Sequence, residues 1–185
     1  NPAYFFNMQS FRYTQDTIDA ELKKSKEDFI LHFRSAYTDD YPPAWMIAEI
    51  LPLGLLCRIY TNLKDNVIKK RVAQHFGLQV PVFSSWIVIL AGLRNMCCHH
   101  CRTWNRELAT ITTEPRRTKY GWIDSSRTDK RRMYYRICMI RYFLYTVSPN
   151  NNFKDKLKTL LAAYPNIDTA AMGFPSDWES EDIWK

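Results

Sequence analysis

Apolar residues recur at helical spacing along most of this chain. Within residues 14–33, Ile18, Leu22, Phe29 and Phe33 are separated by four or seven positions and lie among charged residues. Such spacing places apolar side chains on one face of a helix. The segment therefore predicts an amphipathic helix with a solvated, lysine-rich face.

Three further segments have helical patterns. Residues 66–78 and 151–165 are amphipathic, and Gly77 is expected to stop the first of them. Residues 44–63 are apolar nearly all round, which predicts a central helix. Pro52 lies inside this segment and is expected to kink it.

The segment 81–108 begins apolar and becomes polar. On a helix of 3.6 residues per turn, its apolar side chains form one stripe, which we expect to be buried: Trp86, Leu90, Leu93, Cys97, Cys101 and Trp104. The polar side chains form the opposite face: Asn95, His99, Arg102 and Arg106. Arg94 and Asn105 lie on one flank, and His100 lies at the edge of the apolar stripe.

The remaining segments complete the fold class. Residues 109–128 have turn residues without helical spacing, which predicts a long loop, and residues 129–147 predict an aromatic-rich helix. Aromatic residues of the tail 172–185 are expected to pack back against the rest of the protein. No segment shows the two-residue alternation of apolar and polar residues that is typical of strands. The predicted fold class is therefore all-α, a helical bundle. In the loop, Tyr120 and Trp122 lie among basic residues, which suits either RNA binding or an ordinary exposed loop.

Composition narrows the class of protein. The length of 185 residues suits a single domain over residues 1–185. A content of 46% hydrophobic and 15% aromatic residues excludes a disordered chain. No apolar run approaches the roughly 20 residues of a membrane span, so we expect no membrane partner. The net charge of +7 favours a polyanion, commonly nucleic acid, although a modest excess of lysine in a soluble protein is the simpler explanation.

The five cysteines predict reduced thiols. Cys97, Cys98 and Cys101 share one predicted helix, whereas Cys57 and Cys138 lie alone in apolar segments. Structural zinc sites usually need two separated ligand pairs. We therefore expect no metal and no redox site, and interpret the cysteines as small core residues.

The cations of the segment 94–106 suggest chemistry on phosphate. Guanidinium groups bind phosphate oxygens, and imidazole transfers protons near neutral pH. A solvated helix face is the alternative interpretation. No acidic partner is obvious nearby in the sequence, which favours an anionic ligand.

The stretch "RNMCCHHCRTWNR", residues 94–106, resembles the signature of the Abi-like (AbiD/AbiF) abortive-infection family: RN, a short spacer, then HHxRxWNR. "YPPAWMIAEILPLGLLCRIYTNL" and "SSWIVILAGLRN" also resemble family blocks, in family order. Pro52 departs from the family, which more often has a small polar residue there. The family belongs to the HEPN superfamily, whose mark is an Arg, a polar residue, four to six others, then a His. Arg94, Asn95 and His100 fit that mark.

The resemblance implies a HEPN-type helical bundle with a long loop between the motif helix and the next core helix. It implies a metal-independent endoribonuclease without a cofactor, acting as an antiphage toxin in the bacterial cytoplasm and leaving 2′,3′-cyclic phosphate and 5′-OH ends. It further implies a homodimer with a composite site, RNA as substrate, and a small RNA as a candidate antitoxin. The family is usually longer before Asn1, so we expect the C-terminal part of a longer protein.

Two questions stay open at the level of sequence. Motif spacing selects His100 as the catalytic histidine with Arg94 and Asn95, whereas the helical wheel puts His99 on the more polar face. His99, Arg102, Asn105 and Arg106 are then auxiliary or RNA-binding residues. A non-catalytic RNA-binding protein, or a scaffold that uses the same basic helix, is the alternative function.

Overall fold

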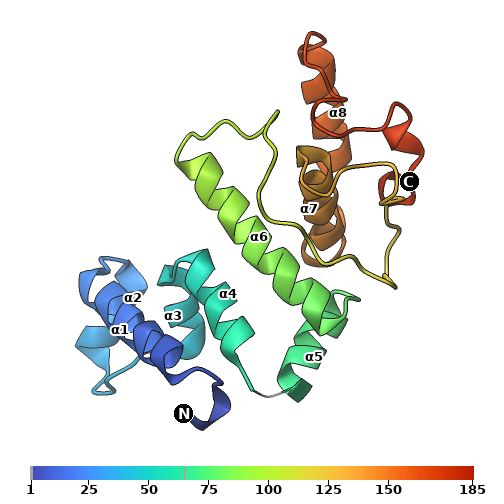
Figure 1. The fold of residues 1–185 in the computed structure, drawn as a ribbon. Coiled ribbons are helices and arrows are strands. Elements are labelled where there is room, and N and C mark those ends of the chain that lie inside the picture. Colours follow the sequence, from blue (N-terminus) through green and yellow to red (C-terminus); the bar gives the residue numbers. More distant parts are fainter. Residues whose placement is uncertain (1, 65) are drawn as a thin grey trace. The chain divides into compact units, whose positions relative to one another are not determined.

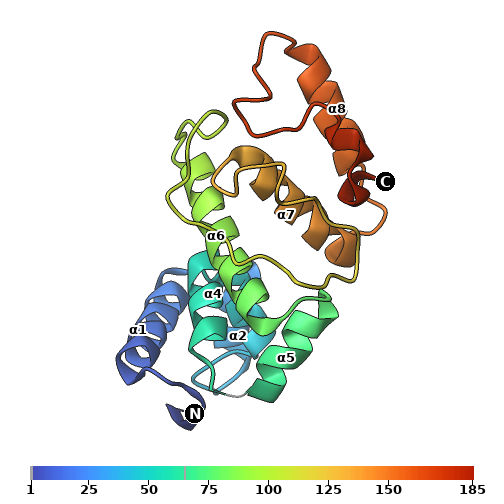
Figure 2. The ribbon, with the colours of Figure 1, turned by 45° about the vertical axis from the view of Figure 1, so that its right-hand side comes forward.

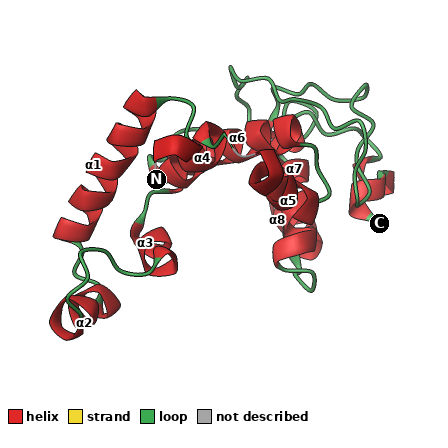
Figure 3. Ribbon diagram, turned by 90° about the horizontal axis from the view of Figure 1, so that it is seen from below, coloured by secondary structure: helices red, strands yellow, loops and turns green. Residues whose placement is uncertain are grey.

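The computed structural model describes residues 2–64 and 66–185; Asn1, where the sequence suggested a truncated start, lies outside them. Within this part of the chain the regular structure is helical (Figure 3), apart from an isolated β-bridge between Phe5 and Leu63. The all-α class is confirmed. The chain divides into two compact units, residues 1–69 and 70–185.

The first unit holds a short 3₁₀ helix and four α-helices (Figure 1): η1 (Pro2–Tyr4), α1 (Met8–Lys24), α2 (Asp28–Ala36), α3 (Ala44–Ile50) and α4 (Leu53–Asn62). α1 packs on α3 and α4. A small apolar core forms from α1, α2 and α3, with these buried members: Leu22, Ile30, Phe33 and Met46. Leu22 and Phe33 are buried as their spacing predicted, Ile18 and Phe29 are only partly buried, and Ile30, which the spacing did not indicate, is buried.

Two predicted helices are each split. The segment 14–33 breaks at Ser25, whose backbone is extended and whose N–H caps α1 by donating to the carbonyls of Glu21 and Leu22. The segment 44–63 breaks between α3 and α4, because the residue before a proline avoids the helical region. Leu51 accordingly has φ −80° and ψ 142°. The predicted kink at Pro52 was wrong, since the helix ends there and a new one begins.

The second unit begins within α5 (Asn66–His75) and continues with α6 (Val80–Cys98), α7 (Met133–Val147) and α8 (Phe153–Ala163). Two 3₁₀ helices follow, η2 (Trp178–Ser180) and η3 (Asp182–Trp184). α6 packs on α7, and the two lie side by side in Figures 1 and 2. No helix occurs between residues 99 and 132, so the predicted long loop is confirmed. Gly77, at φ 66°, follows α5 as predicted.

Trp86 of α6 is at the centre of an aromatic core. Its ring centroid lies 4.7 Å from that of Trp122 in the long loop and 5.5 Å from that of Tyr142 in α7. The indole Nε1 of Trp86 donates to the carbonyl of Thr113 at 3.0 Å. Tyr120 stacks on Tyr145 of α7 at 5.1 Å. The loop's aromatic rings therefore serve the core, which does not support the RNA-binding interpretation of Tyr120 and Trp122.

The tail packs back as predicted. Met172, Phe174 and Trp184 are buried, and the indole Nε1 of Trp184 donates to the hydroxyl of Tyr134 at 3.1 Å. α6 is the one described helix with the length and apolar composition of a membrane span, a property that core helices share.

Candidate functional site

The motif helix ends earlier than its sequence predicts. The N–H of His100 donates to the carbonyl of Cys97 at 3.0 Å, and the N–H of Cys101 donates to that of Met96 at 2.9 Å. This pair of bonds is the Schellman motif that terminates helices, with His99 as the C-cap residue. α6 therefore ends at Cys98. Residues 99–108 are not helical, so the faces that the helical wheel predicted for them do not apply.

His100 occupies the position in this motif that is usually glycine. Its φ is 53°, the left-handed region, and it is the single non-glycine residue with positive φ in the described part of the chain. The left-handed conformation costs L-residues about 1–2 kcal/mol. Strained residues of this kind concentrate at functional sites, where the surrounding structure holds them in place. The imidazole of His100 is thus held beyond the helix end, exposed to solvent.

Replacing His100 by glycine is expected to raise the free energy of unfolding by about 0.5–1 kcal/mol, because glycine adopts positive φ without strain. Urea denaturation of purified protein measures this. His99→Gly is the matched control: at φ −91° glycine relieves nothing, and stability should fall by about 0.5–1 kcal/mol. A loss of stability in both variants contradicts the strain at position 100.

The structure places most predicted site residues on the surface around the end of α6. The exposed members are Arg94, Asn95, His99, His100, Arg102 and Arg106. Asn105 is half-buried. Arg94 Nη1 donates to Asn95 Oδ1 at 3.3 Å, which orients these two side chains together.

The predicted buried stripe is right only in the first part of α6. Trp86 and Leu93 are buried and Leu90 is half-buried, whereas Cys97, in the last turn of α6, is already exposed. Cys101 and Trp104 are exposed because the chain turns away after Cys98. The prediction that Trp104 packs in the core was therefore wrong.

The five cysteines fall into a buried group and an exposed group. Cys57 and Cys138 are buried, and burial raises the pKa of both thiols. The other three are free and exposed, so their interpretation as core residues was wrong. The expectation of no redox site rested on the C-x-x-C spacing of dithiol sites being absent, which was wrong, since Cys98 and Cys101 have that spacing. Across residues 2–64 and 66–185, no three His, Cys, Asp or Glu side chains gather as a metal site.

The loop that follows the Schellman motif is held in place by contacts with the segment before α7. The N–H of Leu108 donates to the carbonyl of Arg131 at 2.9 Å, and Leu108 is buried. Arg131 also forms an ion pair with Glu107. These contacts leave a groove of about 420 Å³, lined by α6, by loop residues 106–110 and by Arg136 of α7. Arg136, which sequence reasoning missed, is one of two arginines in a mainly apolar and aromatic helix.

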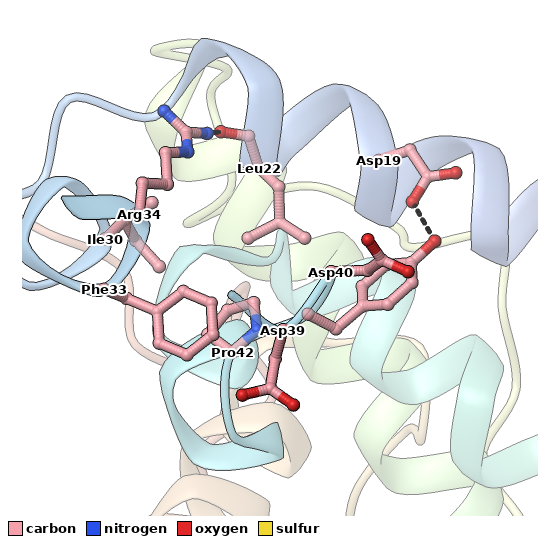
Figure 4. A pocket seen from close by; sticks show the side chains of 9 residues that line it. Asp19, Leu22, Ile30, Phe33, Arg34, Asp39, Asp40 and Pro42 are labelled. Carbon is pink, nitrogen blue, oxygen red and sulfur yellow. Dashed lines mark hydrogen bonds between the residues drawn. The ribbon is translucent and has the colours of Figure 1, made fainter. Parts of the chain in front are cut away.

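A second cavity, of about 310 Å³, lies in the first unit and contains none of the predicted site residues (Figure 4). Its lining includes three carboxylates: Asp19, Asp39 and Asp40. The hydroxyl of Tyr41 donates to Asp19 Oδ1 at 2.7 Å, and this bond with the carboxylate charge raises the pKa of Tyr41. The acidic lining disfavours phosphate, so this cavity is not a candidate nucleic-acid site.

The comparisons with known proteins give one match. A family model described as "Abi-like protein" matches residues 2–105, more than half of the chain. No curated protein and no solved structure matches. The matched range includes the whole of α6, its terminator and every predicted site residue except Arg106. The chain belongs to the Abi-like protein family.

Proposed function

We propose that this protein acts in abortive infection as a metal-independent endoribonuclease toxin of HEPN type. Arg94, Asn95 and His100 are its catalytic residues. The observation that carries the proposal is the end of α6, where the exposed Arg94 and Asn95 precede a histidine held in a left-handed conformation. Membership of the Abi-like family supports the role in defence.

The side chains suit transesterification of RNA. The ribose 2′-OH attacks the adjacent phosphorus and gives its proton to an imidazole, while the bond from phosphorus to the 5′-oxygen breaks. The leaving 5′-oxygen takes a proton, which yields a 2′,3′-cyclic phosphate and a 5′-OH. Arg94 stabilises the charge that develops on the phosphate oxygens.

The guanidinium groups are available for this role. No ion pair between described residues involves Arg94, Arg102 or Arg106. The neighbouring carboxylate, Glu107, is paired with Arg131. His99, Arg102, Asn105 and Arg106 are assigned to orienting the motif or binding RNA.

Exposure of the site favours a dimer. Electrostatic stabilisation of a transition state is strongest where water is excluded, and Arg94, Asn95 and His100 are all exposed in the single chain. A two-fold homodimer that apposes the ends of two α6 helices covers the site and supplies a second histidine, so that one imidazole acts as base and the other as acid.

Incubation with single-stranded RNA in EDTA is expected to give fragments with 2′,3′-cyclic phosphate and 5′-OH ends. Arg94→Ala is expected to lower the cleavage rate by about 10²–10³-fold, the usual cost of losing an oxyanion-stabilising donor. End-group analysis of labelled fragments and initial rates measure both. The matched control is Arg71→Ala, an exposed arginine of α5, which should cleave normally. Fragments with 3′-OH ends, or equal rates for wild type and Arg94→Ala, contradict the proposal; binding without cleavage indicates the non-catalytic alternative.

A further inference from the structure

Arg136 of α7 is a fully buried cation. Its exposed fraction is 0%, and it forms no ion pair with any described carboxylate. One Nη donates to the carbonyl of Thr110, and the other lies 3.7 Å from the sulfur of Met139. Its Nε–H has no hydrogen-bond partner. The positive charge is therefore offset by one neutral carbonyl and one thioether.

Burial of this kind is unfavourable unless an anion compensates it. Removing a charged group from water costs several kcal/mol when no partner replaces the lost hydration. Burial accordingly lowers the pKa of Arg136. An apolar side chain of similar length would fill the same space without that cost, so packing alone does not explain an arginine here.

Arg141, on the same helix, illustrates the usual solution. Its guanidinium lies 4.3 Å from the ring centroid of Tyr145, and it donates to the Tyr145 hydroxyl at 3.1 Å and to Asn151 Oδ1 at 3.2 Å. Its Nε–H, like that of Arg136, has no hydrogen-bond partner, but stacking and two hydrogen bonds compensate its charge. Arg136 has no such set of partners, which distinguishes the two buried arginines of α7.

The position of Arg136 indicates which ligand completes it. Arg136 and its acceptor Thr110 both line the groove beside α6, together with the exposed Arg106. The other lining residues are apolar: Val88, Ile89, Gly92, Leu93, Met96, Leu108 and Ala109. The groove also reaches Met96, whose carbonyl accepts the bond that terminates α6. The groove thus combines two cations, one exposed and one fully buried, with a mainly apolar lining.

We propose that this groove binds a phosphate group of a single-stranded RNA, with Arg106 at the exposed side and Arg136 as the buried cation. The proposal rests on the proposed function for the identity of the strand. Because Arg136 has no exposed surface, the Thr110 backbone moves aside on binding. A phosphate oxygen then replaces the neutral Thr110 carbonyl as the acceptor, which exchanges a weak hydrogen bond for a charge-assisted one. The strand is then held along α6, and Arg94 and His100 act on another phosphodiester of the same strand.

Binding of a fluorescently labelled 2′-O-methyl oligoribonucleotide tests this, because that strand lacks the nucleophile and cannot be cleaved. Fluorescence anisotropy over a range of salt concentrations gives both affinity and the number of phosphate contacts. Arg106→Gln and Arg136→Met are each expected to weaken binding at least about tenfold. Each should also reduce the slope of log K against log[salt] by about 0.7, the value for one phosphate contact on a single strand.

Arg71→Gln, which removes one exposed charge outside the groove lining, controls for net charge and should bind as wild type does. Thermal melts establish folding; if Arg136→Met does not fold, Arg106→Gln decides the question, since Arg106 is exposed. Wild-type affinity and slope in folded Arg106→Gln overturn the proposal, as does equal loss in Arg71→Gln.

Two further arms separate the possible failures. Cleavage of ordinary RNA by variants that bind the analogue normally refutes the groove and leaves the nuclease intact. Loss of analogue binding in both groove variants without any cleavage by wild type supports the groove and refutes the nuclease.

Inorganic phosphate is the remaining source of the same anion. If it raises the Tm of wild type but not of Arg136→Met, while the oligonucleotide does not bind, the ligand is free phosphate and the RNA assignment is wrong.

Discussion

His100→Asn is expected to slow RNA cleavage by about 10²–10⁴-fold, the usual contribution of a general acid or base, and to leave the protein folded. Asparagine lacks a group that transfers protons near neutral pH, yet it tolerates the left-handed conformation that position 100 requires. The substitution therefore removes the chemistry without disturbing the helix terminator. Initial rates on a labelled single-stranded RNA, compared with thermal melts of the same samples, measure both effects.

His99→Asn is the matched control, with the same substitution at the adjacent exposed position. A smaller loss of rate is expected there, because the proposal assigns His99 to orienting the motif or binding RNA. The reverse order of effects assigns proton transfer to His99. Equal rates in wild type and both variants, with every protein folded, remove histidine from the mechanism.

The largest effect on stability is expected for Trp86→Ala. Large-to-small substitution of a buried tryptophan costs about 3–5 kcal/mol, against about 5–15 kcal/mol for the stability of a whole domain. Trp86 has an exposed fraction of 0%, contacts the rings of Trp122 and Tyr142, and fastens Thr113 by a hydrogen bond. Its replacement by alanine removes the contacts that join α6 to the long loop and to α7. Urea denaturation monitored by circular dichroism gives the change.

Trp104→Ala provides the comparison, because the sequence places both tryptophans on one helical stripe. Trp104 is 39% exposed and lies beyond the helix end, so its replacement is expected to cost less than about 1 kcal/mol. A loss for Trp104→Ala as large as that for Trp86→Ala contradicts the early end of α6, since it requires the stripe to continue into the core.

Hydrophobic periodicity predicts the helices of this chain well and their ends poorly. The core residues of α1, α2 and α6 follow their spacing, and the loop before α7 is evident from its turn residues. The end of α6 is not, because no glycine or proline marks it and apolar residues continue to Trp104 at helical intervals. Termination depends on His100 adopting positive φ, which residue type alone does not indicate.

The candidate site is predictable in part for a similar reason. Motif spacing identifies Arg94, Asn95 and His100 regardless of helix length, and the structure places all three on the surface. Motif spacing does not identify Arg136. An arginine is expected at the surface, and only the packing of α7 shows that this one is buried. Burial of Cys101 was predicted wrongly because the helix ends before it, and Cys97 is exposed although it lies in the last turn of α6.

The early end of α6 also bears on how much length variation the motif can accept. On one continuous helix, each residue inserted between the arginine and the histidine would rotate the imidazole by about 100° around the axis. The HEPN mark that this sequence resembles nevertheless allows four, five or six residues there. With the histidine on a chain reversal beyond the helix, an added residue lengthens the turn instead of changing the angular position. A spacer of different length is then compatible with the same placement of the histidine beyond the helix end.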